Sequence, residues 1–299
     1  MARATSPRED RPARAVLVMA AAVFLFTLID TSAKWLIQSG QPAMQVVFAR
    51  YAGALLMALL LFVPREGPGV FRSNRPWLQL LRALALLGST MFNFFALSYL
   101  PITLTIALFF AMPIVTTLLS IPILGEQVGL RRFMAVLVGF FGVLVIVQPW
   151  GAQFHWAVFL SIGALCCAAT YFVLTRLLAG TDNGSTSQLW ANGVATLCLT
   201  PVALKGWVWP DELLNLGVLL FIGILGGTSH ILATLAYRLA PASTLAPVTY
   251  VQVIYATAVG FLVFGTLPTV WTALGTTIII GSGVYIWQRE RVRAGQGGV

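Results

Sequence analysis

Long apolar runs without a single Asp, Glu, Lys or Arg dominate the chain. Residues 83–125 and 133–175 are each 43 residues long, and residues 239–288 make up a third run of 50. A helix needs about 20 apolar residues to cross about 30 Å of hydrocarbon, so each run holds two helices joined by a short turn. With the single spans between them, the pattern predicts ten transmembrane helices over residues 15–37, 44–63, 80–99, 101–123, 131–149, 156–178, 187–205, 213–236, 242–264 and 269–288.

The composition excludes a soluble protein. Of the 299 residues, 59% are hydrophobic and 9% are charged, whereas soluble domains are about 45–50% apolar and about 25% charged. We expect an all-α polytopic membrane protein whose partner is the lipid bilayer. The net charge of +9 is not gathered in a basic patch interleaved with aromatic residues, so no nucleic-acid partner is expected.

The basic residues predict the orientation of the spans. With both termini in the cytoplasm, fifteen of the eighteen Lys and Arg residues fall on the inner side. Only Lys34 and Lys205 fall on the outer side, and Arg50 lies inside a span. Because cytoplasmic loops carry the excess of positive charge, the sequence predicts a multi-pass inner-membrane protein with both termini in the cytoplasm. The first apolar run is too long for a signal peptide, so no cleavage is expected.

The two halves of the chain resemble each other when one is shifted by 140 residues. The string Ala-Leu-Ser-Tyr-Leu-Pro ending at Pro101 aligns with Ala-Tyr-Arg-Leu-Ala-Pro ending at Pro241. Five spans in each half force opposite orientations, which gives the inverted repeat found in many secondary transporters. We therefore expect a basic cytoplasmic tail over residues 1–14, a first repeat of spans 1–5 over 15–149, a second repeat of spans 6–10 over 150–288, and a cytoplasmic tail over 289–299.

Several motifs resemble the EamA type of the drug/metabolite transporter superfamily. They are Lys34 at the end of the first span, Phe-Ala-Arg-Tyr at 48–51, Tyr-Leu-Pro at 99–101 followed by Pro113 and Leu-Gly-Glu at 124–126, and Ala-Tyr-Arg-Leu-Ala-Pro-Ala-Ser at 236–243. The second copy departs from the pattern, because Thr266 stands opposite Glu126. The resemblance implies a ten-helix inner-membrane carrier of small organic solutes.

Two further strings are similar to one branch of that family. His-Ile-Leu-Ala at 230–233 and Ala-Pro-Val-Thr-Tyr at 246–250 resemble the branch that holds riboflavin and S-adenosylmethionine uptake proteins. This implies riboflavin, moved inward, as the first substrate hypothesis. S-adenosylmethionine, amino acids and exported metabolites are the alternatives.

Charged residues inside the spans are the first candidates for a binding site. Asp30 and Lys34 are four residues apart with the acid first, so they share one helical face, and Arg50 enters the second span at a similar depth. Ionisable residues in a membrane face the bundle interior and have partners. The three residues are expected to form one cluster in the outer half of the cavity, either as contacts of a substrate or proton or as a structural network between spans one and two.

Other polar residues of the spans complete the candidate site. Asn93, His230, Thr249, Tyr250, Gln252 and Tyr255 lie on polar stripes of otherwise apolar helices. Such stripes are expected where helices line a cavity, and hydrogen bonding between helices predicts the same pattern. Pro113 and Pro247 each leave one helical carbonyl without its backbone donor.

No catalytic or metal-binding set is evident in the sequence. Two histidines and one deep acid do not supply the usual three or four metal ligands, so we expect no metal and no cofactor. The chain has no nucleotide-binding domain, which excludes ATP-driven transport by this chain alone. The sequence therefore predicts a secondary carrier of a small molecule that works by alternating access, with its oligomeric state open. A membrane enzyme or an assembly protein is the rival hypothesis.

Overall fold

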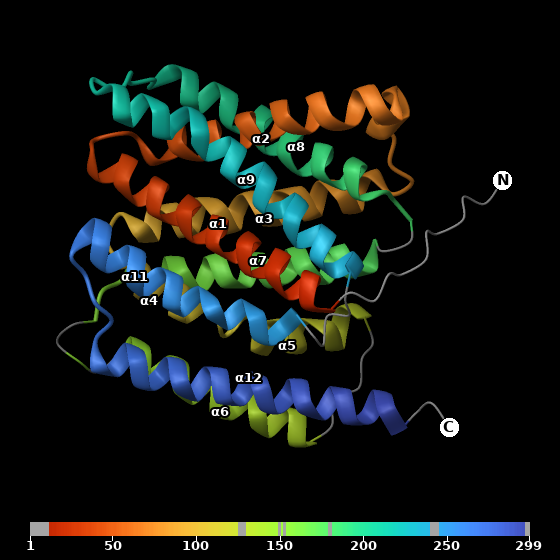
Figure 1. The fold of residues 1–299 in the computed structure, drawn as a ribbon, viewed down its shortest axis with the longest axis vertical. Helices are drawn as coiled ribbons and strands as arrows, with labels where there is room; N and C mark the ends of the chain where they lie inside the picture. The colour runs from red at the N-terminus through yellow and green to blue at the C-terminus, as the bar shows by residue number, and fades with distance from the viewer. Residues whose placement is uncertain are drawn as a thin grey trace.

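A computed structural model describes residues 12–124, 130–148, 151, 154–178, 181–239 and 245–296 (Figure 1). Within these ranges every regular element is a helix and no strand occurs. The predicted all-α fold is confirmed. Residues 1–11 of the expected N-terminal tail and Glu126 lie outside the described residues.

The helices follow the predicted spans. The first half contains α1 (Pro12–Gln38), α2 (Ala43–Glu66), the short η1 (Pro68–Phe71), α3 (Pro76–Leu97), α4 (Ile102–Phe109), α5 (Met112–Leu124) and α6 (Leu130–Val147). The second half contains α7 (Val158–Leu177), α8 (Gly184–Lys205), α9 (Leu213–Leu239), η2 (Ala246–Val251), α11 (Gln252–Phe264) and α12 (Val270–Gln296). Six described segments are long and apolar enough to cross a membrane, and three shorter apolar helices accompany them. The count of ten spans stays a prediction.

Two of the predicted spans are not continuous α-helices. Span four divides into α4 and α5 at Phe110 and Ala111, whose amide groups bond three residues back to Ala107 O and Leu108 O at 3.3 and 3.0 Å. The break precedes Pro113, which has no N–H to offer the carbonyl of Phe109. In span nine, residues 246–251 form the 3₁₀ helix η2, with a proline in its first turn, before α11 begins.

The packing of the helices has the pattern of a two-fold axis between the halves. Helix α1, the first of the first half, packs on α9, the third of the second half. In the same way α7, the first helix of the second half, packs on α3, the third of the first half. The second helices of the two halves, α2 and α8, pack on each other, and so do the last helices, α6 and α12. An inverted repeat predicts this exchange of contacts, because the axis maps each contact onto its counterpart.

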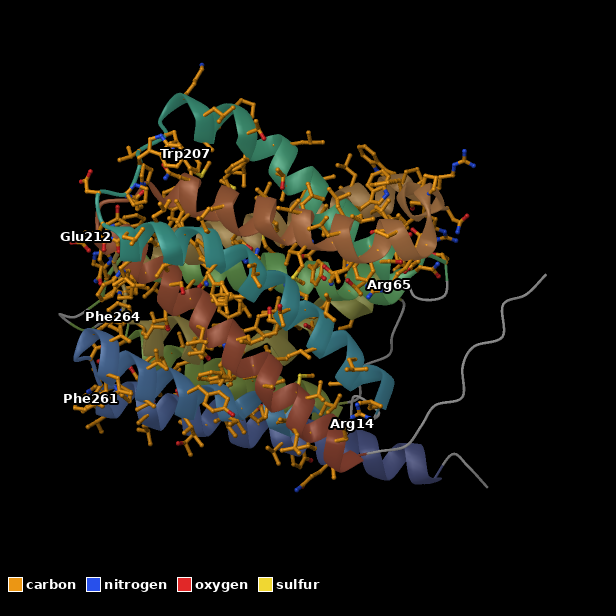
Figure 2. All side chains as sticks on the ribbon, turned by 45° about the horizontal axis from the view of Figure 1, so that its top comes forward. Arg14, Arg65, Trp207, Glu212, Phe261 and Phe264 are labelled. Atoms are coloured by element: carbon orange, nitrogen blue, oxygen red, sulfur yellow. The ribbon has the colours of Figure 1, made fainter. Side chains whose placement is uncertain are left out.

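The two ends of the bundle differ in their side chains. Arg14 and Arg65 lie at one end, and Trp207, Glu212 and Phe264 lie at the other (Figure 2). We call these the Arg65 end and the Trp207 end. The start of α1 and the end of α12 both lie at the Arg65 end (Figure 1), as an even number of crossings requires. The last helix continues through residues 289–296, which the sequence assigned to the tail.

Glycine allows a close helix crossing between the halves. Gly53 of α2 faces Gly223 of α9, and a Cβ atom built on Gly223 would lie 2.5 Å from the Cα of Gly53 and 3.0 Å from the carbonyl oxygen of Ala49. Two helix backbones come this near only where neither carries a side chain, as small-residue motifs of membrane helices do. This crossing brings α9 against the helix that carries Arg50.

Candidate functional site

A group of polar side chains from α1, α2 and α3 meets inside the first half of the bundle. Asn93 Nδ2 donates a hydrogen bond of 2.9 Å to Asp30 Oδ1. Arg50 Nη1 donates to Thr90 Oγ1 at 3.2 Å, and the Arg50 guanidinium lies 4.6 Å from the centre of the Tyr51 ring. We call Asp30, Arg50, Thr90 and Asn93 the central group.

Arg50 is under-satisfied for a buried guanidinium. Only 7% of its surface is exposed, and its Nε atom has no hydrogen-bond partner. Nε faces the glycine surface of α9, where a Cβ on Gly226 would lie 3.7 Å from it. No ion pair joins Arg50 to any acid in the part of the chain that the structure describes, although its charge acts on Asp30. A buried donor without a partner costs about 1–3 kcal/mol, which makes this N–H a candidate donor to a ligand in another state of the transport cycle.

Lys34 has partners other than the central group. Its Nζ atom donates to the carbonyl oxygens of Leu97 at 3.0 Å and Leu100 at 2.6 Å, at the C-terminal end of α3. It also lies 5.6 Å from the centre of the Phe264 ring. The single cluster of Asp30, Lys34 and Arg50 expected from the sequence is therefore divided in two. The long lysine side chain carries its ammonium group to the end of α3, whereas Asp30 bonds to Asn93 within that helix.

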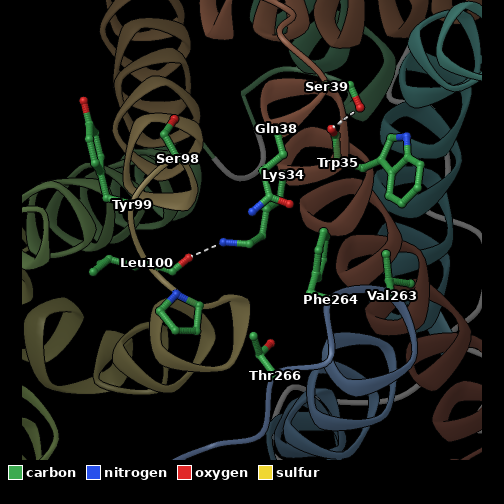
Figure 3. A pocket seen from close by; sticks show the side chains of 11 residues that line it. Lys34, Trp35, Gln38, Ser39, Ser98, Tyr99, Leu100, Val263, Phe264 and Thr266 are labelled. Carbon is green, nitrogen blue, oxygen red and sulfur yellow. Dashed lines mark hydrogen bonds between the residues drawn. The ribbon is translucent and has the colours of Figure 1, made fainter. Parts of the chain in front are cut away.

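A cavity of about 490 Å³ opens beside Lys34 (Figure 3). Its walls come from the end of α1, from the turn between α3 and α4, and from the end of α11, so both halves line it. Trp35, Tyr99 and Phe264 supply aromatic surface, and Thr266 supplies a hydroxyl. We call this the Lys34 cavity. A second cavity of about 290 Å³ shares Tyr99 with it and reaches Trp271.

The other predicted residues lie between the central group and the second half. His230 packs edge-on against Phe26 of α1, with 5.2 Å between ring centres. The positive charge of Arg50 acts on its imidazole ring. Tyr255 makes a similar contact with Phe24, also at 5.2 Å. These contacts put α9 and α11 against the helix that carries Asp30.

Tyr250, Thr249 and Gln252 continue this wall of the bundle. Tyr250 packs edge-on against Phe110, at the break between α4 and α5, with 5.4 Å between ring centres. All three residues are half-buried, as Asp30, His230 and Tyr255 are. Partial exposure of polar groups deep in a bundle is typical of helices that line a water-filled cavity.

Arg82 is a buried residue that the sequence reasoning missed. Charge counting assigned it to the inner side, but it is only 4% exposed. Its guanidinium donates to Thr175 Oγ1 at 2.6 Å, to Tyr171 Oη at 2.8 Å and to the carbonyl oxygen of Ser187 at 3.1 Å. It lies six residues inside α3, and that position was the available signal.

Asp182 joins the two halves at the Arg65 end. Its carboxylate accepts hydrogen bonds from Ser73 Oγ at 2.5 Å, from Gln79 Nε2 at 2.8 Å and from the backbone N–H of Asn74 at 2.8 Å. Partial burial raises the pKa of Asp182, but these hydrogen bonds together outweigh it and hold the pKa below its usual value. The residue connects the α2–α3 segment to the α7–α8 segment.

Replacing Asp182 with Asn is expected to lower the melting temperature of the purified protein by a few degrees at neutral pH, since it weakens the hydrogen bonds to this carboxylate, which are worth about 1 kcal/mol each. The folded-state pKa is depressed, so the bonds stabilise the fold fully above about pH 4 and are lost as the pH falls through that lower pKa. The difference in melting temperature between wild type and variant should therefore disappear only in strong acid. Equal melting temperatures at pH 7 would contradict this role.

The comparison with protein families decides the class of the protein. A model of the EamA-like transporter family matches the chain twice, over residues 13–148 and 155–287. The chain belongs to this family. One match in each half accounts for the two-repeat architecture seen in the packing.

Individual relatives agree with the family match. A riboflavin transporter of Vibrio cholerae is 30% identical over 289 residues, which cover 94% of this chain and 95% of that protein. An S-adenosylmethionine uptake transporter of Rickettsia prowazekii is 25% identical over 83% of each chain. A solved crystal structure with 18% sequence identity and a TM-score of 0.61 covers 93% of this chain and 98% of its own, so it shares the fold. The EamA protein described here is a multi-pass membrane transporter of a small metabolite.

Proposed function

We propose that this protein is a secondary transporter that takes up riboflavin across the inner membrane. The observation that carries the proposal is the near full-length similarity to a riboflavin transporter. The site is consistent with such a substrate, because aromatic walls and a few polar donors are the usual lining of a pocket for a flat heterocycle. S-adenosylmethionine uptake and metabolite export are the alternatives.

The proposed path runs from the Lys34 cavity to the central group. Asp30 lies four residues before Lys34 on α1, about 6 Å deeper at 1.5 Å per residue. Helices of both halves pack along α1, which carries Asp30 and Lys34: α3 of the first half and α9 and α11 of the second. Alternating access follows if the halves rock about the two-fold axis, so that the central group faces each side of the membrane in turn.

The deciding experiment measures transport in proteoliposomes that contain the purified full-length protein. Labelled riboflavin, S-adenosylmethionine and a set of amino acids are tested for uptake and for counterflow. Riboflavin counterflow that unlabelled riboflavin competes away is the expected result. Counterflow of S-adenosylmethionine alone would assign the protein to the alternative, and transport of neither would reject both.

We also propose that the Arg65 end faces the cytoplasm, with repeats over residues 15–149 and 150–288. Cysteine labels at Ser39 and Gly206, and at Gln153 outside the described residues, are expected to react with an impermeant maleimide in intact cells. Labels at Ser73, Asn183 and Gln296 are expected to react only after permeabilisation. A reversed pattern would overturn the orientation that the basic residues predict.

A further inference from the structure

The Lys34 cavity holds a positive charge, and no acid stands among the described residues that line it. Within this described lining Lys34 is the only charged side chain, and it is 5% exposed. Two carbonyl oxygens accept hydrogen bonds from its ammonium group, which has three N–H donors. The third N–H is left for a ligand. In a partly desolvated site such a charge attracts electron-rich groups and repels cations more strongly than it would in water.

An exposed aromatic side chain, Tyr99, lines the same cavity as this charge. Tyr99 is 54% exposed and lines both cavities. Its ring stacks on that of His155, with 5.5 Å between centres and 26° between planes, and Trp156 lies 5.1 Å away. Aromatic faces of this kind bind flat ring systems. The described lining of the cavity therefore combines an aromatic surface for stacking with one positive charge.

The cavity lies between the two halves of the bundle, whose contacts must change during transport. Lys34 and Tyr99 belong to the first half, and Phe264 and Thr266 belong to the second (Figure 3). Its volume of about 490 Å³ is within the range of small-molecule sites, about 300–1,000 Å³. The residues of the central group are not in the lining of this cavity. The cavity is therefore a site separate from the central group on the proposed path.

We propose that the Lys34 cavity is an entry site that selects planar aromatic ligands that are neutral or anionic and rejects cationic ones. The inference deepens the proposed function and rests on it only in placing the cavity on the transport path. It predicts that a flavin enters the cavity easily, whereas the positive charge of Lys34 repels a cationic sulfonium compound such as S-adenosylmethionine.

Binding of matched three-ring probes to the full-length protein in nanodiscs tests the charge selection. The probes are riboflavin 5′-phosphate, which is anionic, lumiflavin, which is neutral, and proflavine, which is cationic, each followed by fluorescence anisotropy. Wild-type protein is expected to bind riboflavin 5′-phosphate at least about tenfold more tightly than proflavine, with the ratio falling as salt is added. Equal affinity for the anionic and cationic probes would overturn the proposal.

Variants separate the charge of Lys34 from a structural role. Gln38 is an exposed residue of the same lining, four residues after Lys34 on α1, so Gln38→Glu adds a negative charge beside the ammonium group while Lys34 itself is kept. This variant should lower the anion-to-cation affinity ratio by about fivefold or more. Lys34→Met should weaken riboflavin 5′-phosphate binding, and Lys34→Arg should retain it. Lys205 is an exposed lysine at the same end but outside the cavity, and Lys205→Met should leave the ratio unchanged.

The two proposals fail in different ways. If Gln38→Glu leaves the affinity ratio unchanged while riboflavin counterflow persists, charge selection by the cavity is wrong and the proposed function stands. If the ratio behaves as expected but no flavin is transported, the cavity selects by charge and the substrate assignment is wrong.

Discussion

Gly223→Ala is expected to leave little folded protein in the membrane. The new Cβ would sit 2.5 Å from the Cα of Gly53, and a backbone atom cannot rotate away as the end of a side chain does. Helix α9 must then move off α2, and α9 also packs along α1. Overpacking of a close-packed interior costs about 1–3 kcal/mol and more where backbones must shift, so the loss should be at the upper end of that range.

The yield of monodisperse protein in size-exclusion chromatography and its melting temperature measure this loss. Gly217→Ala is the matched control, because it lies on the same helix and a Cβ there has no neighbour within 4 Å. Alanine favours a helix over glycine by about 1 kcal/mol, so the control should be neutral or slightly stabilising. A Gly223→Ala protein that melts at the wild-type temperature would show that α2 and α9 are not in backbone contact.

The helical segments were predictable because lipid imposes a simple rule on the sequence. A charge within a span is costly, so stretches free of charge mark the helices almost directly. The breaks at Phe110 and in residues 246–251 were not predicted, because the loss of backbone donors at Pro113 and Pro247 does not by itself say whether a helix continues or divides. What hydropathy does not contain is the rotation of each helix and the identity of its neighbour.

The partners of the charged residues show this limit. The i,i+4 spacing correctly places Asp30 and Lys34 on one face of α1. It does not reveal that Asp30 accepts a hydrogen bond from Asn93, or that Lys34 donates to carbonyl oxygens at the end of α3. Arg82 was counted only as a charge of the inner side, because its partners, among them Tyr171 and Thr175, lie about 90 residues further along the chain. Pairings between the halves depend on the packing of the repeats, which the sequence of either half alone does not specify.

Asp30→Asn is expected to reduce riboflavin counterflow by about tenfold or more without unfolding the protein, a change of about 1.4 kcal/mol or more in free energy. Asparagine has nearly the same shape, and its Oδ1 can still accept the hydrogen bond that Asn93 donates to Asp30 at 2.9 Å. The substitution removes the negative charge near Arg50, whose guanidinium has no ion-pair partner among the described residues. A buried cation with no nearby counter-charge holds an electron-rich ligand too tightly to release it in each cycle.

Asp211→Asn is the control for this variant, since Asp211 is an exposed acid at the Trp207 end, away from the central group. Its counterflow should equal that of the wild type, and both variants should elute as folded protein. Normal counterflow by Asp30→Asn would show that the charge near Arg50 is dispensable and would make the hydrogen bond to Asn93 a structural one.

The same variant distinguishes a fixed counter-charge from a proton carrier. If Asp30 stays ionised beside Arg50, the transporter follows the gradient of its solute, and an imposed pH gradient should not drive accumulation. A proton-carrying Asp30 would instead give uphill uptake that a protonophore abolishes and that Asp30→Asn lacks, while counterflow, which needs no net proton movement, would persist in the variant. Burial of Asp30 disfavours the charged carboxylate, whereas the charge of Arg50 and the hydrogen bond from Asn93 favour it. We expect the first outcome, in which these two partners hold the carboxylate ionised against the cost of its burial. Uphill uptake abolished by the protonophore would contradict it and identify Asp30 as the coupling site.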